Sequence, residues 1–122
     1  MFADTDFILG LLKDSDWLKE NAVKILDGYK GKIKTSISVM IEVALICKRL
    51  NMDVLNTFAH IFEIIIVDEK TQEVCLRAAL YITKYGLGVF DSFNAAFSIN
   101  DKIISSDSVY DTLGLARLNL RG

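Results

Sequence analysis

The sequence predicts an α/β fold: one domain over residues 1–122, with a mainly parallel central sheet of about four to five strands, flanked by helices in an α/β/α sandwich. Short runs of apolar and β-branched residues alternate with longer segments whose apolar residues recur at helical spacing. The 122 residues fit one domain, and 52% of them are hydrophobic, which is enough for a sizeable core. The chain has no proline, and no stretch of biased composition marks a linker.

The first third of the chain predicts two strands and two helices. Met1 to Ala3 is short and apolar and runs directly into Asp4, which ends a short buried strand. Apolar residues from Leu18 to Tyr29 recur at helical spacing, and glycines close that helix. The expected elements are a strand over residues 1–3, helices over 7–13 and from 14–16 to 28, and a strand over 32–36.

The rest of the chain continues this alternation. Ser38 is expected to cap a long helix that ends near Leu50. A run of β-branched residues from Ile64 to Val67 gives the clearest strand of the chain. The expected elements are helices over residues 38–50, 54–60, 70–85 and 90–99, and strands over 63–67, 102–106 and 118–120.

Charge and hydropathy exclude several classes of protein. The formal net charge is −2, so the whole molecule does not attract nucleic acid, and RNA contact would need a local patch or metal ions. No segment reaches the roughly 20 apolar residues that span a bilayer, and the N-terminus lacks the basic start of a signal peptide, so a cytoplasmic protein without membrane contact is expected. Cys47 and Cys75 are interpreted as reduced core residues. Some basic residues are candidates for contact with RNA phosphates, although most such residues simply lie on the solvated surface. The candidates are Lys13, Lys34, Lys48, Arg49, Lys102 and Arg117.

Acidic residues follow the expected strands at the edge where parallel sheets bind ligands. Asp4 follows the first strand, and Asp107 follows the strand over residues 102–106. Asp91 opens the helix over residues 90–99, where a helix cap is the simpler interpretation. Taken alone, Asp91 is better explained as a helix cap, and Asp4 as an ordinary turn acid.

Glu42 is the only charged residue between Val39 and Cys47. It shares a helical face with Val39 and Ile46, so it is expected to point inward. A buried carboxylate needs a cation or hydrogen-bond donors, which leaves two alternatives: a buried salt bridge, or a metal ion shared with other acids. Converging carboxylates repel one another unless a cation neutralises them, and oxygen ligands suit Mg²⁺ or Mn²⁺.

Four local patterns resemble the motifs of PIN-domain proteins, and the chain is close in size to the VapC-type toxins of toxin–antitoxin pairs. The resemblance covers essentially the whole chain, and the order and spacing of the motifs carry it. The segments are Phe2 to Asp6 with Ile8-Leu9, similar to an opening strand and its DTN motif; Ser36 to Val43, similar to a Ser/Thr-x-x-x-Glu helix start; Asp91 to Ala96, similar to a DAxxAA helix; and Ile104 to Asp107, similar to an xTxD strand end.

The resemblance implies a metal-dependent ribonuclease, a hydrolase that cleaves RNA phosphodiester bonds with metal-activated water. It also implies a homodimer and a VapB-type antitoxin that blocks the site. Asp6 is then a supporting acid or substitute ligand, and Ser38 a hydrogen-bond donor behind the ligands. The implied set of catalytic and Mg²⁺- or Mn²⁺-binding residues is Asp4, Glu42, Asp91 and Asp107.

The chain departs from the family pattern just after its fourth acid. Members often carry another acid two residues further on, where this chain has Val109. Asp111 lies nearby but out of register, and Tyr110 takes the place of the usual aromatic residue. The changes are expected to weaken a second metal position, so the sequence leaves open whether one ion or two bind. They do not affect the four acids themselves.

Two alternatives come from other classes of function. A receiver domain is also a small α/β domain with acids at strand ends, and Asp68 would be its phosphoacceptor, but its lysine at a later strand end has no match and Glu42 has no role in it. The second alternative is a PIN-like module that binds RNA or a partner without catalysis. The helices over residues 7–12 and 54–60 are candidates for an apolar stripe that contacts a second copy or an antitoxin helix.

Overall fold

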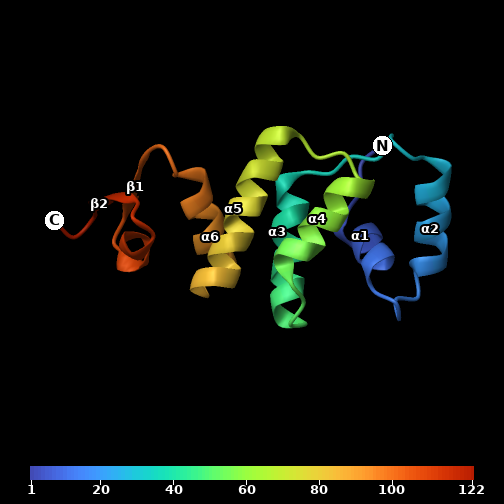
Figure 1. The fold of residues 1–122 in the computed structure, drawn as a ribbon, viewed down its shortest axis with the longest axis horizontal. Helices are drawn as coiled ribbons and strands as arrows, with labels where there is room; N and C mark the ends of the chain where they lie inside the picture. The colour runs from blue at the N-terminus through green and yellow to red at the C-terminus, as the bar shows by residue number, and fades with distance from the viewer.

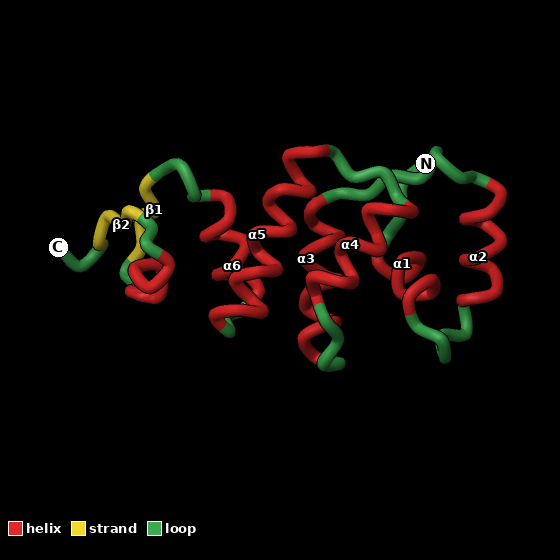
Figure 2. The backbone as a smooth tube through the Cα atoms, viewed as in Figure 1, coloured by secondary structure: helices red, strands yellow, loops and turns green.

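The structure, a computed structural model, describes residues 1–122, and helices dominate it (Figure 1). Strands occur only near the C-terminus, at one end of an elongated molecule (Figure 2). The elements are α1 (Thr5–Leu12), α2 (Lys19–Gly28), α3 (Ile37–Arg49), α4 (Val54–Ile64), α5 (Glu69–Tyr85), α6 (Val89–Phe97), β1 (Lys102–Ser105), the 3₁₀ helix η1 (Ser108–Leu113) and β2 (Ala116–Asn119).

The continuous sheet of four to five strands is not formed, so this part of the prediction is wrong. The one regular sheet has two parallel strands, in which Lys102 of β1 lies opposite Ala116 of β2. Three further extended segments meet through single parallel bridges, with Phe2 beside Lys34 and Lys34 beside Ile66. The α/β class therefore holds in a mostly helical form, but the sheet is divided into two separate parts and no α/β/α sandwich is built.

Helices extend into residues that were expected to be strand. α4 continues to Ile64 instead of ending near His60, because its apolar face stays in register with the core through Phe58 and Ile61, both completely buried. The strand expected over residues 63–67 is thereby reduced to the single bridge at Ile66. Helical burial outweighs the β preference of branched residues here.

The core lies among α3, α4, α5 and α6. Met40, Val43, Phe58 and Ala78 are completely buried within one cluster. The rings of Phe58 and Phe93 meet edge to face, with centroids 6.4 Å apart, and this contact joins α4 to α6. Cys47 and Cys75 are free and buried, as the sequence predicted.

Two predicted helix caps are corrected. The residue that precedes α3 is Ser36, and Ser38 lies in its first turn, with the two hydroxyl oxygens 2.8 Å apart. Gly88 precedes α6, so Asp91 lies inside the first turn and does not cap the helix. Asp68 caps α5 by accepting a 2.9 Å hydrogen bond from the Thr71 N–H.

The segment from β1 to the C-terminus, residues 102–122, forms what we call the C-terminal unit. Arg117 holds it together: its guanidinium donates to both Asp111 carboxylate oxygens, at 2.8 and 2.9 Å, and to the Ser105 carbonyl at 2.9 Å. Figure 1 shows the unit beyond α6, at the end of the molecule opposite to α1 and α2. None of the helices combines the length and apolar character that crossing a bilayer requires.

Candidate functional site

Asp4 and Glu42 are brought together by Thr5. Asp4 ends the first extended segment and caps α1, where its carboxylate accepts a 2.7 Å hydrogen bond from the Thr5 N–H. The Thr5 hydroxyl donates a 2.8 Å hydrogen bond to Oε2 of Glu42 on α3. Thr5 itself is buried. Two of the four predicted acids thus flank one threonine that the sequence analysis did not select.

Glu42 is exposed, which corrects the expectation that it points into the core. Its neighbours Val39 and Val43 are buried, so α3 turns its apolar stripe inward and leaves Glu42 at the border with α1. Thr5 is the only residue that hydrogen-bonds to this carboxylate. No buried salt bridge is needed, and one carboxylate oxygen remains free to bind a ligand from solvent.

Asp91 is hydrogen-bonded to Tyr110, and the charge of Asp107 also acts on this tyrosine. The Tyr110 hydroxyl donates a 3.2 Å hydrogen bond to Asp91 Oδ1, and the tyrosine is only 4% exposed. Asp107 precedes η1 and accepts a 2.9 Å hydrogen bond from the Val109 N–H. Burial raises the pKa of Tyr110, and the charges of Asp91 and Asp107 raise it further, against the opposing effect of a hydrogen bond with Asn94.

The four acids therefore form two pairs and not one cluster. The first pair is Asp4, at the start of α1, and Glu42 on α3. In the second, Asp91 on α6 bonds to Tyr110 of the C-terminal unit, and Asp107 precedes the 3₁₀ helix of that unit. No three acidic, histidine or cysteine side chains are arranged to hold a metal ion. Carboxylate oxygens are the donors that Mg²⁺ and Mn²⁺ prefer, so the chemistry of the set fits such an ion, although this arrangement presents the donors in two halves.

The two supporting residues differ in their placement. Asp6 lies in the first turn of α1 and lines the same surface pocket as Asp4, a hollow of about 300 Å³ bordered also by Met1 and Phe2. Ser38 bonds only to Ser36 and reaches none of the acids. Asp6 is therefore positioned to support Asp4, whereas Ser38 is not positioned to support Glu42.

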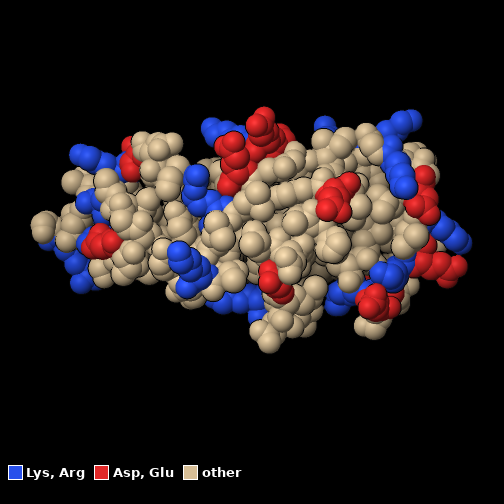
Figure 3. All heavy atoms as spheres, viewed as in Figure 1, with Lys and Arg blue, Asp and Glu red and all other residues tan.

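Two of the predicted basic residues are already engaged within the protein. Lys48 donates to the Leu87 carbonyl at 3.1 Å, and Arg117 binds Asp111. Figure 3 shows acidic and basic side chains interspersed over the visible face, with no continuous basic band there. His60 is exposed.

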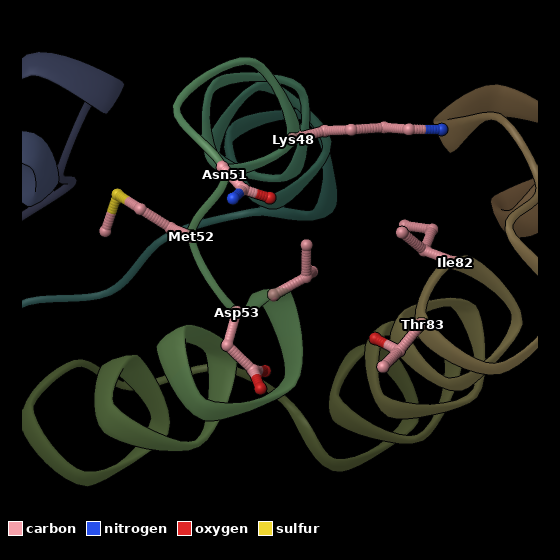
Figure 4. Close-up of a pocket in the computed structure, with 7 residues that line it drawn as sticks. Lys48, Asn51, Met52, Asp53, Ile82 and Thr83 are labelled. Atoms are coloured by element: carbon pink, nitrogen blue, oxygen red, sulfur yellow. The ribbon is translucent and has the colours of Figure 1, made fainter.

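Another pocket, of about 380 Å³, lies between the end of α3, the start of α4 and the end of α5 (Figure 4). Lys48, Met52, Asp53 and Thr83 are among its lining residues. Both charged side chains of this pocket have hydrogen-bond partners within the protein. Lys48 donates to the Leu87 carbonyl, and Asp53 caps α4 by accepting from the Asn56 N–H. This pocket contains none of the four acids.

Carboxylates can hold a divalent ion, and such an ion can polarise a phosphoryl oxygen and activate water. A family model described as PIN domain matches residues 1–114, which is most of the chain. The chain belongs to the PIN domain family, whose fold is generally that of a nuclease and whose nucleases generally use divalent metals. Comparisons with curated proteins and with solved structures gave no match.

The family assignment excludes one of the two alternatives that the sequence left open. It removes the receiver domain, and Asp68 has the ordinary role of a helix cap. It confirms the PIN-domain part of the resemblance.

Proposed function

We propose that the chain is an endoribonuclease that hydrolyses RNA phosphodiester bonds with Mg²⁺ or Mn²⁺. The observation that carries this proposal is the link between Asp4 and Glu42 through Thr5, which joins two acids from distant parts of the sequence; Thr5 and Glu42 are 37 residues apart. A family whose fold is generally a nuclease adds independent support. The ligand set proposed for the cation is Asp4, Glu42, Asp91 and Asp107, with Asp6 in support.

The proposed reaction is an ordinary hydrolysis. A divalent cation, when bound, activates water and neutralises charge on the phosphoryl oxygens. The water oxygen bonds to phosphorus and gives up a proton, the bond to the leaving ribose oxygen breaks, and that oxygen takes up a proton. Thr5 holds one oxygen of Glu42 in place before any ligand arrives, as neighbours of metal-binding groups commonly do. Asp4 and Glu42 are both exposed, so RNA and a cation can reach them from solvent.

The test is cleavage of a labelled mixed-sequence RNA by the purified protein, with Mg²⁺, with Mn²⁺ and with a chelator. Asp4→Asn, Glu42→Gln and Asp91→Asn should each reduce cleavage by roughly 100-fold or more. Loss of a residue that only orients a metal ligand already lowers activity by roughly 10- to 100-fold, and loss of the ligand itself should lower it at least as much. Asp27→Asn is the matched control, since Asp27 is an exposed aspartate on α2 outside both pairs. Cleavage that persists in the variants or in chelator would overturn the proposal, and metal-dependent RNA binding without cleavage would identify a non-catalytic module.

We extend the proposal to the toxin of a VapBC-type pair, with a cytoplasmic location and a small antitoxin as partner. The resemblance in size and motif order supports this step. Controlled expression in a bacterial host is expected to stop growth with the wild-type chain and not with Asp4→Asn. Continued growth with a protein that cuts RNA in the test tube would restrict the proposal to the nuclease.

A further inference from the structure

Two surface hollows adjoin beside Asp4, between the start of α1 and α2. The larger has a volume of about 300 Å³ and the smaller a volume of about 170 Å³. Asp6, Phe7 and Ile25 line both, so the two spaces meet at these residues. We call the combined space the Asp6 hollow. Asp4 also lines the larger part, which places the hollow next to the first pair of acids.

Close packing of α1 on α2 builds the walls of the Asp6 hollow. Figure 1 shows the two helices side by side near the N-terminus. Gly10 allows this approach, because a Cβ added there would lie 3.3 Å from the Ala22 side chain. The Lys19 side chain donates to the Leu11 carbonyl at 2.8 Å and joins the start of α2 to the end of α1. Contacts within the protein therefore form the hollow before any ligand binds.

The walls of the Asp6 hollow are mostly apolar, and no basic residue lines them. Phe2 is 57% exposed and Ile25 is 42% exposed, although both side chains are large and apolar. Aromatic and aliphatic walls suit a flat, uncharged ring, and ligand sites commonly have volumes from about 300 Å³ upward. A phosphate group does not fit in this space, because Asp4 and Asp6 would repel it.

The acidic groups of the hollow have free capacity to accept hydrogen bonds. Asp4 uses Oδ1 to accept from the Thr5 N–H. The Asp6 carboxylate takes part in no hydrogen bond or ion pair within the protein, so both of its oxygens are free. An ionised carboxylate only accepts, through two oxygens that lie side by side. A ligand that satisfies Asp6 and also covers the apolar walls must combine a flat ring with two adjacent N–H donors.

Guanine is the standard RNA base that has this combination. Its N1–H and its N2 amino group are neighbouring donors on one edge of the ring, and they can meet both oxygens of a carboxylate as a guanidinium does. Adenine and cytosine carry a ring-nitrogen acceptor beside their amino group, and uracil has a carbonyl oxygen on each side of its N3–H. A carboxylate repels these acceptors, so the other three bases fit Asp6 less well.

We propose that the Asp6 hollow binds a guanine base, with the Asp6 carboxylate accepting from N1–H and the N2 amino group, and with the ring against the apolar walls. The source of the base rests on the proposed function: a nucleotide of RNA whose phosphate lies at Asp4 places its base in the adjoining hollow. Base pairing covers the same edge of guanine, so the RNA bound here is single-stranded. Asp6 then supports cleavage by positioning the base, while Asp4 remains with the cation.

Nucleosides test the hollow without reference to cleavage, because they carry no phosphodiester. Guanosine is titrated, in the presence of a chelator, into the wild-type chain with labelled isoleucine methyl groups. The methyl resonances of Ile25 and Ile33, which line the hollow, should shift, and those of Ile104 on β1 should not. Inosine lacks the N2 amino group and should bind about 10-fold more weakly, since it loses one hydrogen bond to a charged group. Asp6→Asn should remove this difference, and Asp27→Asn, which changes an exposed aspartate of α2 outside the hollow, should retain it.

Three results of the titration would overturn the proposal. They are an absence of shifts at Ile25, equal binding of guanosine and inosine, and an unchanged preference in Asp6→Asn. Methylguanidinium is the comparison probe, and tighter binding of this cation than of guanosine would instead assign the hollow to a basic side chain of a protein partner.

Cleavage of RNA tests the role of the hollow in the proposed reaction. A chain of uridines with a single guanosine should be cut beside that guanosine, and inosine in its place should lower kcat/KM about 10-fold. Cleavage at all positions alike would overturn the assignment of the hollow to the substrate. Binding of guanosine by a protein that cuts no RNA would refute only the proposed function.

Discussion

The Thr5 hydroxyl donates a 2.8 Å hydrogen bond to Glu42 Oε2, and this bond fixes α1 against α3 at the point where the two acids meet. The same threonine donates its N–H to Asp4 at 2.7 Å. A neutral residue therefore sets the relative position of the two carboxylates. It holds them without a positive charge, which leaves the charge of a cation to be added from solution.

Replacement of Thr5 tests this arrangement. Thr5→Val keeps the shape of the side chain and removes the hydroxyl. The free energy of unfolding in urea should fall by about 1 kcal/mol, because the exposed Glu42 carboxylate can replace the lost hydrogen bond in part with one from water. RNA cleavage should fall as well, because Glu42 loses its orientation. Thr5→Ser retains the donor and should keep most of both properties. Wild-type stability and cleavage in Thr5→Val would show that the bond is incidental.

The contact between Tyr110 and Asp91 should control how firmly the C-terminal unit is attached. Tyr110→Phe keeps the buried ring and removes one hydrogen bond, which is worth about 0.5–1.5 kcal/mol. Amide hydrogen exchange should then become faster in β1 and β2 and stay unchanged in α3 to α5. Tyr81→Phe on α5 is the control, because no hydrogen bond to the Tyr81 hydroxyl is present. Equal acceleration in both variants would argue against a specific anchor.

The C-terminal unit should loosen in acid. Hydrogen bonds from the Arg117 guanidinium hold the pKa of Asp111 below its ordinary value. A carboxyl group with a lower pKa in the folded state stabilises that state above its unfolded pKa of about 4, and this contribution is lost as the pH falls through the folded pKa. Exchange of amides in β2 should therefore rise below about pH 4. Asp111→Asn should exchange faster at neutral pH and show less of this dependence; an unchanged profile would contradict the role of the pair.

The two cysteines should be inert in the native protein. Burial raises the pKa of Cys75 to about 12, and burial is also the main cause that raises the pKa of Cys47. Thiolate is the reactive form, so a colorimetric thiol reagent at about pH 8 should react with neither residue before denaturation and with both afterwards. Rapid reaction of a native thiol would show that the core opens.

Helices were predictable from the sequence because their signal is local. The helix expected over residues 70–85 is observed as Glu69–Tyr85, and the helix expected from residue 38 to 50 is observed as Ile37–Arg49. A hydrogen bond between residues four apart and an apolar stripe of period 3.6 both lie within a short window. The motifs that contain the acids are equally local, and their order along the chain indicated the PIN domain family.

The sheet was predicted less well because strand pairing joins residues far apart in the chain. Ile64 belongs to a β-branched run, yet it ends α4, because Ile61 just before it is buried in the helix-packed core. β2 is observed at Ala116–Asn119 and was expected at residues 118–120. Whether an extended segment becomes part of a sheet depends on the edge it meets, and that edge lies elsewhere in the sequence.

The sequence by itself indicated the helices, the buried free cysteines and the family, and it predicted the four acids of the proposed site. Only the tertiary structure decided that Glu42 is exposed beside Thr5, that Asp91 binds Tyr110 instead of capping α6, and that the acids stand as two pairs. The physical reason is the range of the interactions: helix periodicity and motif spacing act between near neighbours, whereas the exposure and partners of a carboxylate depend on which distant elements pack against it.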